Sequence, residues 1–229
     1  MGHYRGRVTE IRFDLNRHLE ALIACPSRAV PHAGQYLLAS DPDDPSASLG
    51  SSLFLAGQTV QGFWAVSSMP VAWKPGTTIQ LVGPLGHGFN LPANVQRLGL
   101  VGLGYTLARL MPVIQHFTAT QGSMTLFSDL PLPEAPAALE AYPLASLVDA
   151  LDWPDFMAFD LPLERLSELR DILKLAGGRG LPCPAQALVT SPMPCAGMAQ
   201  CGACAIPARR GWKLVCEDGP VFDLQSLKW

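Results

Sequence analysis

Residues 195–222 read CAGMAQCGACAIPARRGWKLVCEDGPVF and hold four of the six cysteines of this 229-residue chain. These four, Cys195, Cys201, Cys204 and Cys216, follow the spacing C-x5-C-x2-C-x11-C. Two thiolates separated by two residues can reach one metal site from a single tight turn. In a reducing compartment such a group of cysteines is typical of a metal site rather than of disulfides. The stretch therefore predicts a metal-bearing C-terminal segment.

The cysteine spacing does not by itself decide which metal is bound. Zinc and iron–sulfur clusters both accept four thiolates, so ligand type alone leaves both open. The residues between the cysteines, 196–200 and 202–203, are mostly small and carry no charge, which lets backbone N–H groups point toward bridging sulfides. Plant-type [2Fe–2S] loops read C-x4-C-x2-C before a distant fourth cysteine, so this chain differs by one residue in the first gap. The pattern favours an iron–sulfur cluster, with a zinc site as the alternative and Cys25 and Cys183 as ordinary core residues.

The first ninety or so residues form short apolar or alternating runs, separated by turn clusters such as HAGQ and KPGT. Six runs at this spacing predict an antiparallel β-barrel or sandwich. The expected strands are Arg7–Phe13, Leu19–Ala24, Gln35–Ala39, Leu53–Leu55, Gly62–Val66 and Thr78–Val82.

After Arg97 strand-like and helix-like runs alternate, which is typical of a small parallel α/β layer. The expected strands are Arg97–Gly102, Ser123–Phe127 and Phe156–Asp160, and the expected helices are Thr106–His116, Leu144–Leu151 and Leu163–Leu175. The remainder, from Pro182 onward, is expected to be loop-rich. We therefore predict an α+β multidomain chain: a β-barrel at residues 1–92, a Rossmann-like α/β domain at 93–181 and a cysteine-rich [2Fe–2S] segment at 182–229.

Composition narrows the function further. Charged residues make up 15% of the chain, well below the roughly 25% of ordinary soluble domains, which hints at a face covered by a partner. The net charge of −3 without a basic block argues against nucleic acid as that partner. The longest uncharged stretches contain Gly, Pro, Ser and Gln, so no membrane span is expected, and no secretory signal is visible. A cytoplasmic location is the resulting expectation.

Three further motifs occur along the chain in the same order as in a known family. They are Pro31-His-Ala-Gly-Gln-Tyr36, Gly83-Pro-Leu-Gly-His-Gly-Phe89 and Cys216-Glu-Asp-Gly-Pro-Val-Phe222. With the cysteine loop they resemble the electron-transfer subunit of the two-subunit, NAD-linked class of dihydroorotate dehydrogenase, in the ferredoxin reductase superfamily. The resemblance implies FAD on the barrel and a [2Fe–2S] cluster held by the four cysteines.

The same resemblance implies a place for each nucleotide. For FAD and for the glycine-rich turn of the nicotinamide half, the matching residues are Gln35, Tyr36, Ser51, Ser52, Leu53, Ser67, Ser68, Gly102 and Gly104. However, Leu49-Gly-Ser-Ser-Leu-Phe54 stands in the place of the family's arginine-containing flavin motif, and no Arg or Lys lies between Arg28 and Lys74. A diphosphate would then rest on backbone amides and hydroxyls alone. FAD therefore stays an open expectation.

The nicotinamide half departs further from the family pattern. Tyr105 and Leu107 put bulk where a dinucleotide needs glycine, and the family's C-G-P segment is replaced by residues 158–162 without its Cys or Gly. We expect no NAD on this chain.

The expected function is an electron relay in a hetero-oligomer. The cluster would pass electrons between a flavin-containing catalytic oxidoreductase subunit and a second acceptor, as in the dihydroorotate dehydrogenase of pyrimidine biosynthesis. No catalytic triad or carboxylate pair is legible, and such a carrier needs none. The alternative is a non-enzymatic paralogue that keeps the cluster as a structural or redox-sensing module without FAD or NAD.

Overall fold

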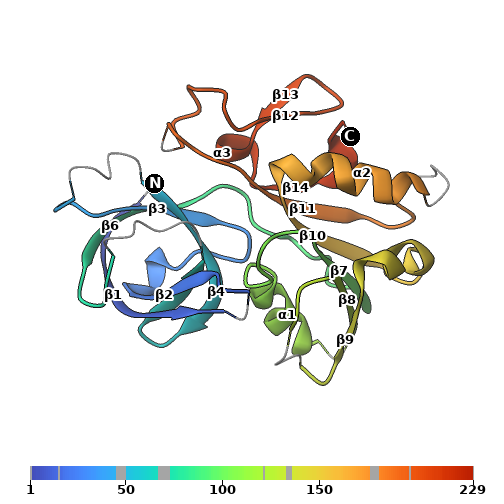
Figure 1. Ribbon diagram of the computed structural model, residues 1–229, viewed down its shortest axis with the longest axis horizontal. Coiled ribbons are helices and arrows are strands. Elements are labelled where there is room, and N and C mark those ends of the chain that lie inside the picture. Colours follow the sequence, from blue (N-terminus) through green and yellow to red (C-terminus); the bar gives the residue numbers. More distant parts are fainter. Residues whose placement is uncertain are drawn as a thin grey trace.

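The computed structural model contains a closed β-barrel, a six-stranded sheet and the cysteine-rich segment that lies over both (Figure 1). The described residues are 2–14, 16–44, 50–66, 73–120, 122–132, 136–175, 181–195 and 197–228. The expected fold class, a barrel followed by an α/β layer and a cysteine-rich C-terminus, is confirmed.

The barrel closes in the order β1-β2-β5-β4-β3-β6, with every neighbouring pair antiparallel. Its strands are β1 Gly2–Phe13, β2 Leu19–Ala24, β3 Tyr36–Ser40, β4 Ser51–Thr59, β5 Gly62–Val66 and β6 Thr78–Leu85. Side chains such as Ile23, Leu53 and Phe63 fill its interior. The first strand begins earlier than expected because residues 2–7 pair with β6 and close the barrel, although they carry no long apolar run. Pairing with a distant strand leaves no local signal of that kind.

The second sheet has the order β14-β11-β10-β7-β8-β9. Its strands are β7 Arg97–Gly102, β8 Ser123–Ser128, β9 Leu139–Tyr142, β10 Phe156–Pro162, β11 Ala185–Thr190 and β14 Val221–Asp223. All pairs are parallel except that of β14 with β11. β11 and β14 lie beyond Pro182, where a loop-rich tail was expected, and so do the short strands β12 (Ala205–Pro207) and β13 (Trp212–Leu214). The expectation was wrong for these four strands.

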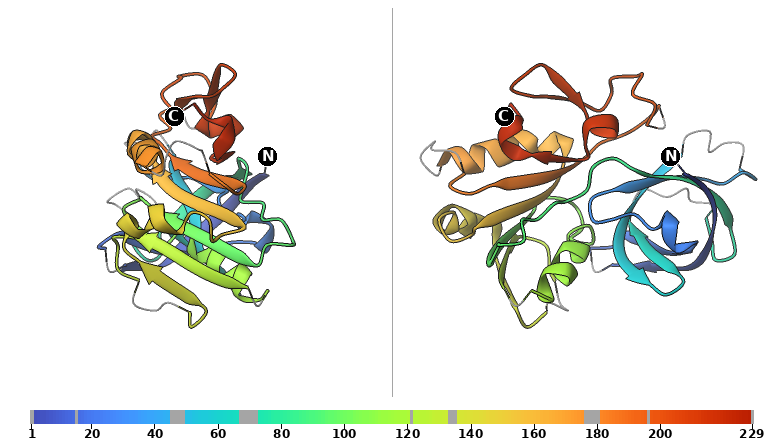
Figure 2. Two further views of the ribbon diagram at one scale, coloured as in Figure 1. Left: turned by 90° about the vertical axis from the view of Figure 1, so that its right-hand side faces the viewer. Right: turned by 180° about the vertical axis from the view of Figure 1, so that it is seen from behind.

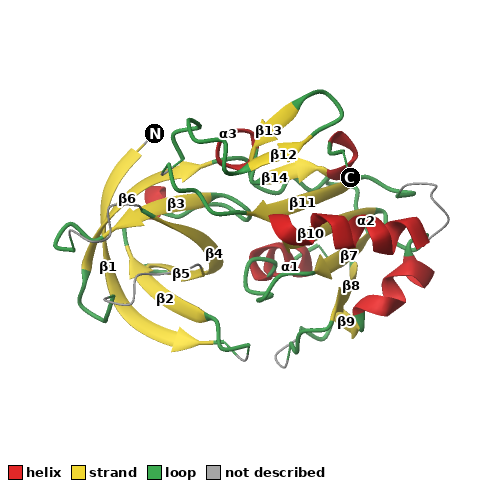
Figure 3. Cartoon of the chain, turned by 45° about the horizontal axis from the view of Figure 1, so that its top comes forward, coloured by secondary structure: helices red, strands yellow, loops and turns green. Residues whose placement is uncertain are grey.

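Helices cover both faces of this sheet (Figures 2 and 3). α1 (Met111–Thr118) packs on Leu98 and Leu100 of β7, whereas α2 (Leu166–Leu175) packs in the cluster that holds Val101. Alternate residues of a strand point to opposite faces, so one apolar run serves both helices. No helix in the described part of the chain is long and apolar enough to cross a membrane.

The expected helices needed three corrections. α1 starts at Met111 rather than Thr106 because a helix from Thr106 would place Pro112 in its interior, where proline removes a hydrogen bond and clashes with the preceding turn. The run expected as a helix at Leu144–Leu151 is a 3₁₀ helix at Leu144–Ala150. The run at Leu163–Leu175 divides into a 3₁₀ turn, Leu163–Arg165, and α2.

The cysteine-rich segment is attached to the barrel along a contact that we call the seam. Residues 31–36, 83–89 and 219–222 form it. In the seam His87 N donates to Gly219 O (2.6 Å), and Val221 N donates back to His87 O (3.3 Å). Gln35 Nε2 also donates to Gly86 O (3.1 Å). The three sequence motifs therefore meet at one place, the barrel face against which the segment packs.

Candidate metal centre and neighbouring cavity

Three of the cysteines, Cys195, Cys201 and Cys204, lie in the loop after β11, and Cys216 lies in the short helix that follows a small hairpin. That hairpin joins β12 (Ala205–Pro207) and β13 (Trp212–Leu214) and leads into the short helix α3 (Val215–Asp218). Val215 N donates to Cys204 O (3.0 Å), and this contact brings the Cys204 and Cys216 sulfurs to 3.4 Å from each other. Both side chains are buried.

Cys195 and Cys201 form a second pair. The backbone N–H of Gln200, followed by the Cys201 side chain and the N–H groups of Cys201 and Met198, lowers the pKa of Cys195 to about 6. The loop can turn its N–H groups inward because Gly197, Ala199 and Gly202 adopt positive φ of 73°, 57° and 69°. These N–H groups stabilise a thiolate rather than a thiol.

The second pair of sulfurs has a different environment. Burial raises the pKa of Cys216 to about 12, and Cys204 adds to the shift, whereas the backbone N–H of Ala199 opposes it. Burial likewise raises the pKa of the neighbouring Tyr36, and the Cys216, Cys204 and Cys195 thiolates add to that rise. The charge of the cysteine segment therefore acts on this barrel side chain.

Thiol side chains with backbone donors around them are the kind of ligand set that an iron–sulfur cluster takes. Each iron of a [2Fe–2S] centre with four cysteines is held by two thiolates, and the chain presents two thiol pairs with backbone donors around them. In the described residues no three His, Cys, Asp or Glu side chains gather closely enough to hold a metal ion. Of the four cysteines that the spacing singled out, Cys204 and Cys216 are in contact, and that all four hold one cluster stays a prediction.

Tyr36 connects this centre to the barrel. Its ring is fully buried, and its hydroxyl donates to the Cys216 carbonyl at 3.0 Å. The same ring lies 5.9 Å, centroid to centroid, from the ring of Phe54 on β4. Since Phe54 lines the neighbouring cavity, Tyr36 spans the distance from the cavity wall to the cysteines.

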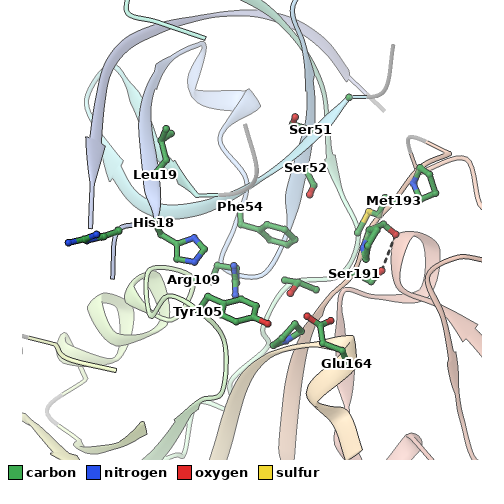
Figure 4. Close-up of a pocket in the computed structure, with 16 residues that line it drawn as sticks. His18, Leu19, Ser51, Ser52, Phe54, Tyr105, Arg109, Glu164, Ser191 and Met193 are labelled. Carbon is green, nitrogen blue, oxygen red and sulfur yellow. Dashed lines mark hydrogen bonds between the residues drawn. The ribbon is translucent and has the colours of Figure 1, made fainter. Parts of the chain in front are cut away.

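That cavity has a volume of about 740 Å³ and lies between the barrel, the α/β sheet and the start of the cysteine segment (Figure 4). Its size is that of a small-molecule or cofactor site. Its lining combines aromatic rings, hydroxyls and cations. The lining residues are Arg17, His18, Leu19, Gly50, Ser51, Ser52, Phe54, Tyr105, Arg109, Pro162, Glu164, Thr190, Ser191, Pro192, Met193 and Pro194.

The residues expected to hold nucleotides are distributed among several places. Ser51 and Ser52 line the cavity. Gln35 and Tyr36 lie in the seam, and Leu53 is fully buried in the barrel core. Gly102 is the last residue of β7, and Gly104 follows two residues later. Ser67 and Ser68 lie outside the described residues.

Sequence reasoning missed three cationic or titratable groups of the cavity. Arg17 and His18 come from the turn between β1 and β2, where Arg17 has a φ of +60°. Arg109 comes from the loop before α1. The cavity therefore contains arginines, which the sequence around Leu49 lacks, and they come from segments far away in the chain. The left-handed backbone at a non-glycine residue is unusual, but it leaves no trace in the sequence.

The end of β7 does not fit a nicotinamide dinucleotide. The Leu107 side chain packs where a Cβ on Gly102 would lie, and it is only 3% exposed. The α1 N-terminus begins at Met111, away from the glycine-rich turn that it would have to meet in a dinucleotide site. The strand end of β10 is occupied by a buried ion pair, in which Arg109 Nε lies 2.9 Å from Asp160 Oδ1.

Comparison with known proteins agrees with both parts of this description. Residues 191–228 match the family described as the iron–sulfur cluster binding domain of dihydroorotate dehydrogenase B. Among curated proteins none matches the sequence.

Solved structures resemble most or nearly all of the chain. A structure described as the NADH-dependent reduced ferredoxin–NADP oxidoreductase, in work on flavin-based electron bifurcation, matches with a TM-score of 0.74 and 20% identity over 98% of this chain and 90% of that one. The Amycolatopsis cytochrome P450 reductase matches with a TM-score of 0.58 and 12% identity over 82% and 70%. The ferredoxin reductase of carbazole 1,9a-dioxygenase matches with a TM-score of 0.57 and 18% identity over 79% and 64%.

The chain therefore has the ferredoxin reductase-like fold. Its residues 191–228 are similar to the iron–sulfur cluster binding domain of dihydroorotate dehydrogenase B, and the expected resemblance is confirmed at this level.

Proposed function

We propose that this protein is the electron-transfer subunit of an oxidoreductase complex. In this proposal a [2Fe–2S] cluster is held by Cys195, Cys201, Cys204 and Cys216, and FAD occupies the neighbouring cavity. The chain would relay electrons between a flavin-containing catalytic subunit and a second acceptor, as in dihydroorotate dehydrogenase, and it would do so in the cytoplasm.

One observation carries the proposal: the cavity and the cysteine centre share a wall. Residues 190–194 line the cavity, and Cys195 is the next residue in the chain. On the barrel side, Phe54 lines the cavity and Tyr36 bonds to the Cys216 carbonyl. Two redox groups held at these positions would be neighbours, separated by buried side chains rather than by water.

In this proposal the residues of the chain bind the two redox groups and exclude water between them. When bound, the cluster supplies one-electron transfer and the flavin links it to two-electron chemistry. The backbone N–H groups around Cys195 stabilise its thiolate, and the seam fixes the segment against the barrel. Phe54 and Tyr36 exclude water between the two positions.

The test is a spectrum of the anaerobically purified protein from 300 to 700 nm, with an acid extract assayed for FAD. Iron–sulfur bands together with extractable FAD support the relay. A colourless preparation that contains zinc would contradict it.

A second candidate function is favoured by the end of β7. Because Leu107 and the Arg109–Asp160 pair do not fit a nicotinamide dinucleotide, the chain could keep its cluster as a structural or redox-sensing module without nucleotides. Iron–sulfur bands without any extractable flavin, in protein reconstituted with excess FAD, would favour this module over the relay.

A further inference from the structure

Arg109 is the most deeply buried cation of the cavity. Its side chain is 10% exposed, and the carboxylate that it meets, that of Asp160, is 0% exposed. Burial raises the pKa of Asp160, whereas the charge of Arg109 and its hydrogen bonds oppose that shift. An isolated charge at either position would be costly, so each residue depends on the other.

The geometry of the pair leaves part of the guanidinium available. Arg109 Nε donates to both Asp160 oxygens, at 2.9 and 3.1 Å. Within the part of the chain that the structure describes, the two Nη groups have no hydrogen-bond acceptor, although the residue lines the cavity. A guanidinium presents five N–H donors, so a buried one that uses only Nε still has four to offer.

The surroundings of Arg109 suit a planar ring. Its guanidinium carbon lies 5.9 Å from the centroid of the Phe54 ring. Tyr105, which lines the same end of the cavity, stacks at 6.2 Å on His18 (Figure 4). By contrast, the other arginine of the cavity, Arg17, is exposed to water, as suits a hydrated phosphate.

We propose that Arg109 is a flavin-binding residue whose Nη groups contact the isoalloxazine ring rather than the phosphates. Asp160 is its positioning residue and holds the guanidinium through Nε. This inference rests on the proposed function, since it requires flavin in the cavity.

The test compares riboflavin, FMN and FAD, which share the ring but differ in their phosphates. Their dissociation constants are measured on flavin-stripped full-length protein that retains its cluster, for the wild type and for Arg109→Gln/Asp160→Asn. The double variant removes both charges together, so no uncompensated charge stays buried. Loss of hydrogen bonds from a charged group is expected to weaken binding about tenfold or more, by one common factor for the three ligands.

The matched control is Arg97→Gln/Asp155→Asn. This pair is also an Arg–Asp ion pair, at 2.6 Å, but it is more exposed and lies outside the cavity. It should leave all three dissociation constants unchanged. The cluster absorbance and the melting temperature of each variant report whether it folds. If the double variant does not fold, Arg109→Lys keeps the charge opposite Asp160 and should still lower the three affinities by a common, smaller factor.

Three results would overturn the inference. Unchanged affinities would show that Arg109 does not touch the ligand, and a loss limited to FMN and FAD would place it at the phosphates. Failure of the wild type to bind any of the three flavins would remove the flavin part of the proposed function as well. The cluster spectrum of the same sample then tells the two failures apart.

Discussion

Replacing Tyr36 by Phe removes one hydroxyl and keeps the ring that packs on Phe54. In the native protein this hydroxyl donates to the Cys216 carbonyl at 3.0 Å, and the residue is fully buried. Leaving a buried acceptor without its donor costs about 1–3 kcal/mol. For a chain of this length each kcal/mol corresponds to about 2–4 °C. We therefore expect the melting temperature of Tyr36→Phe to fall by about 2–12 °C.

The assay follows unfolding at two signals, far-ultraviolet circular dichroism and the visible absorbance of the cluster. Because the lost bond joins the barrel to the cysteine segment, the cluster signal should be lost at a lower temperature than the barrel signal. The control is Tyr142→Phe, which removes a hydroxyl that bonds to Glu140 from a side chain that is 45% exposed. Surface changes of this kind stay within about 0.5 kcal/mol. If Tyr36→Phe were no less stable than Tyr142→Phe, the hydroxyl would not be what attaches the segment.

Three further predictions concern the seam, the cluster and the nicotinamide end. Gly86→Ala should lower the melting temperature more than Gly211→Ala does. Both glycines have positive φ (72° and 75°), but only at Gly86 would a Cβ meet Gly219 O and Pro220 Cδ, each at 2.5 Å. Equal decreases in melting temperature would contradict the contact between the barrel and the cysteine segment at the seam. Removal of iron with a chelator should speed amide hydrogen exchange in residues 191–228 while the barrel core stays protected. The reason is that metal binding contributes directly to the folding of its ligand segment. Equally faster exchange in the barrel core and in residues 191–228 would refute this prediction. Anaerobic NADH should not bleach the flavin or cluster absorbance of the isolated chain, since Leu107 packs beside Gly102; bleaching within seconds in stopped flow would show a working nicotinamide site.

Features that depend on local spacing could be predicted from the sequence. The C-x5-C-x2-C-x11-C pattern identified Cys204 and Cys216, whose sulfurs lie 3.4 Å apart, whereas a shared cluster on all four cysteines stays a prediction. The alternating runs gave the positions of the barrel strands because one face of each strand is buried. Local propensity failed at Thr106, where Pro112 delays the helix, and at β11 and β14, which are short strands stabilised by pairing partners far away in the chain.

Some residues that line the cavity could not be predicted from the sequence. Arg17 and Arg109 come from the turn after β1 and the loop before α1, so no window of sequence contains both or relates either to Ser52. Conversely, Gln35 and Tyr36 belong to a family motif, yet Gln35 contacts Gly86 in the seam and Tyr36 contacts the Cys216 carbonyl in the cysteine segment. A sequence motif can therefore indicate that residues are functionally related, but the contacts that they make are known only from the structure.

The most direct measurement is the iron and sulfide content of anaerobically purified protein, combined with electron paramagnetic resonance after one-electron reduction. The account predicts about two irons and two sulfides per chain and one unpaired spin. The spin should vanish when any one of Cys195, Cys201, Cys204 and Cys216 is replaced by Ser, and it should persist in Cys25→Ser and Cys183→Ser. One zinc per chain without a signal, or a signal that survives all four substitutions, would contradict it.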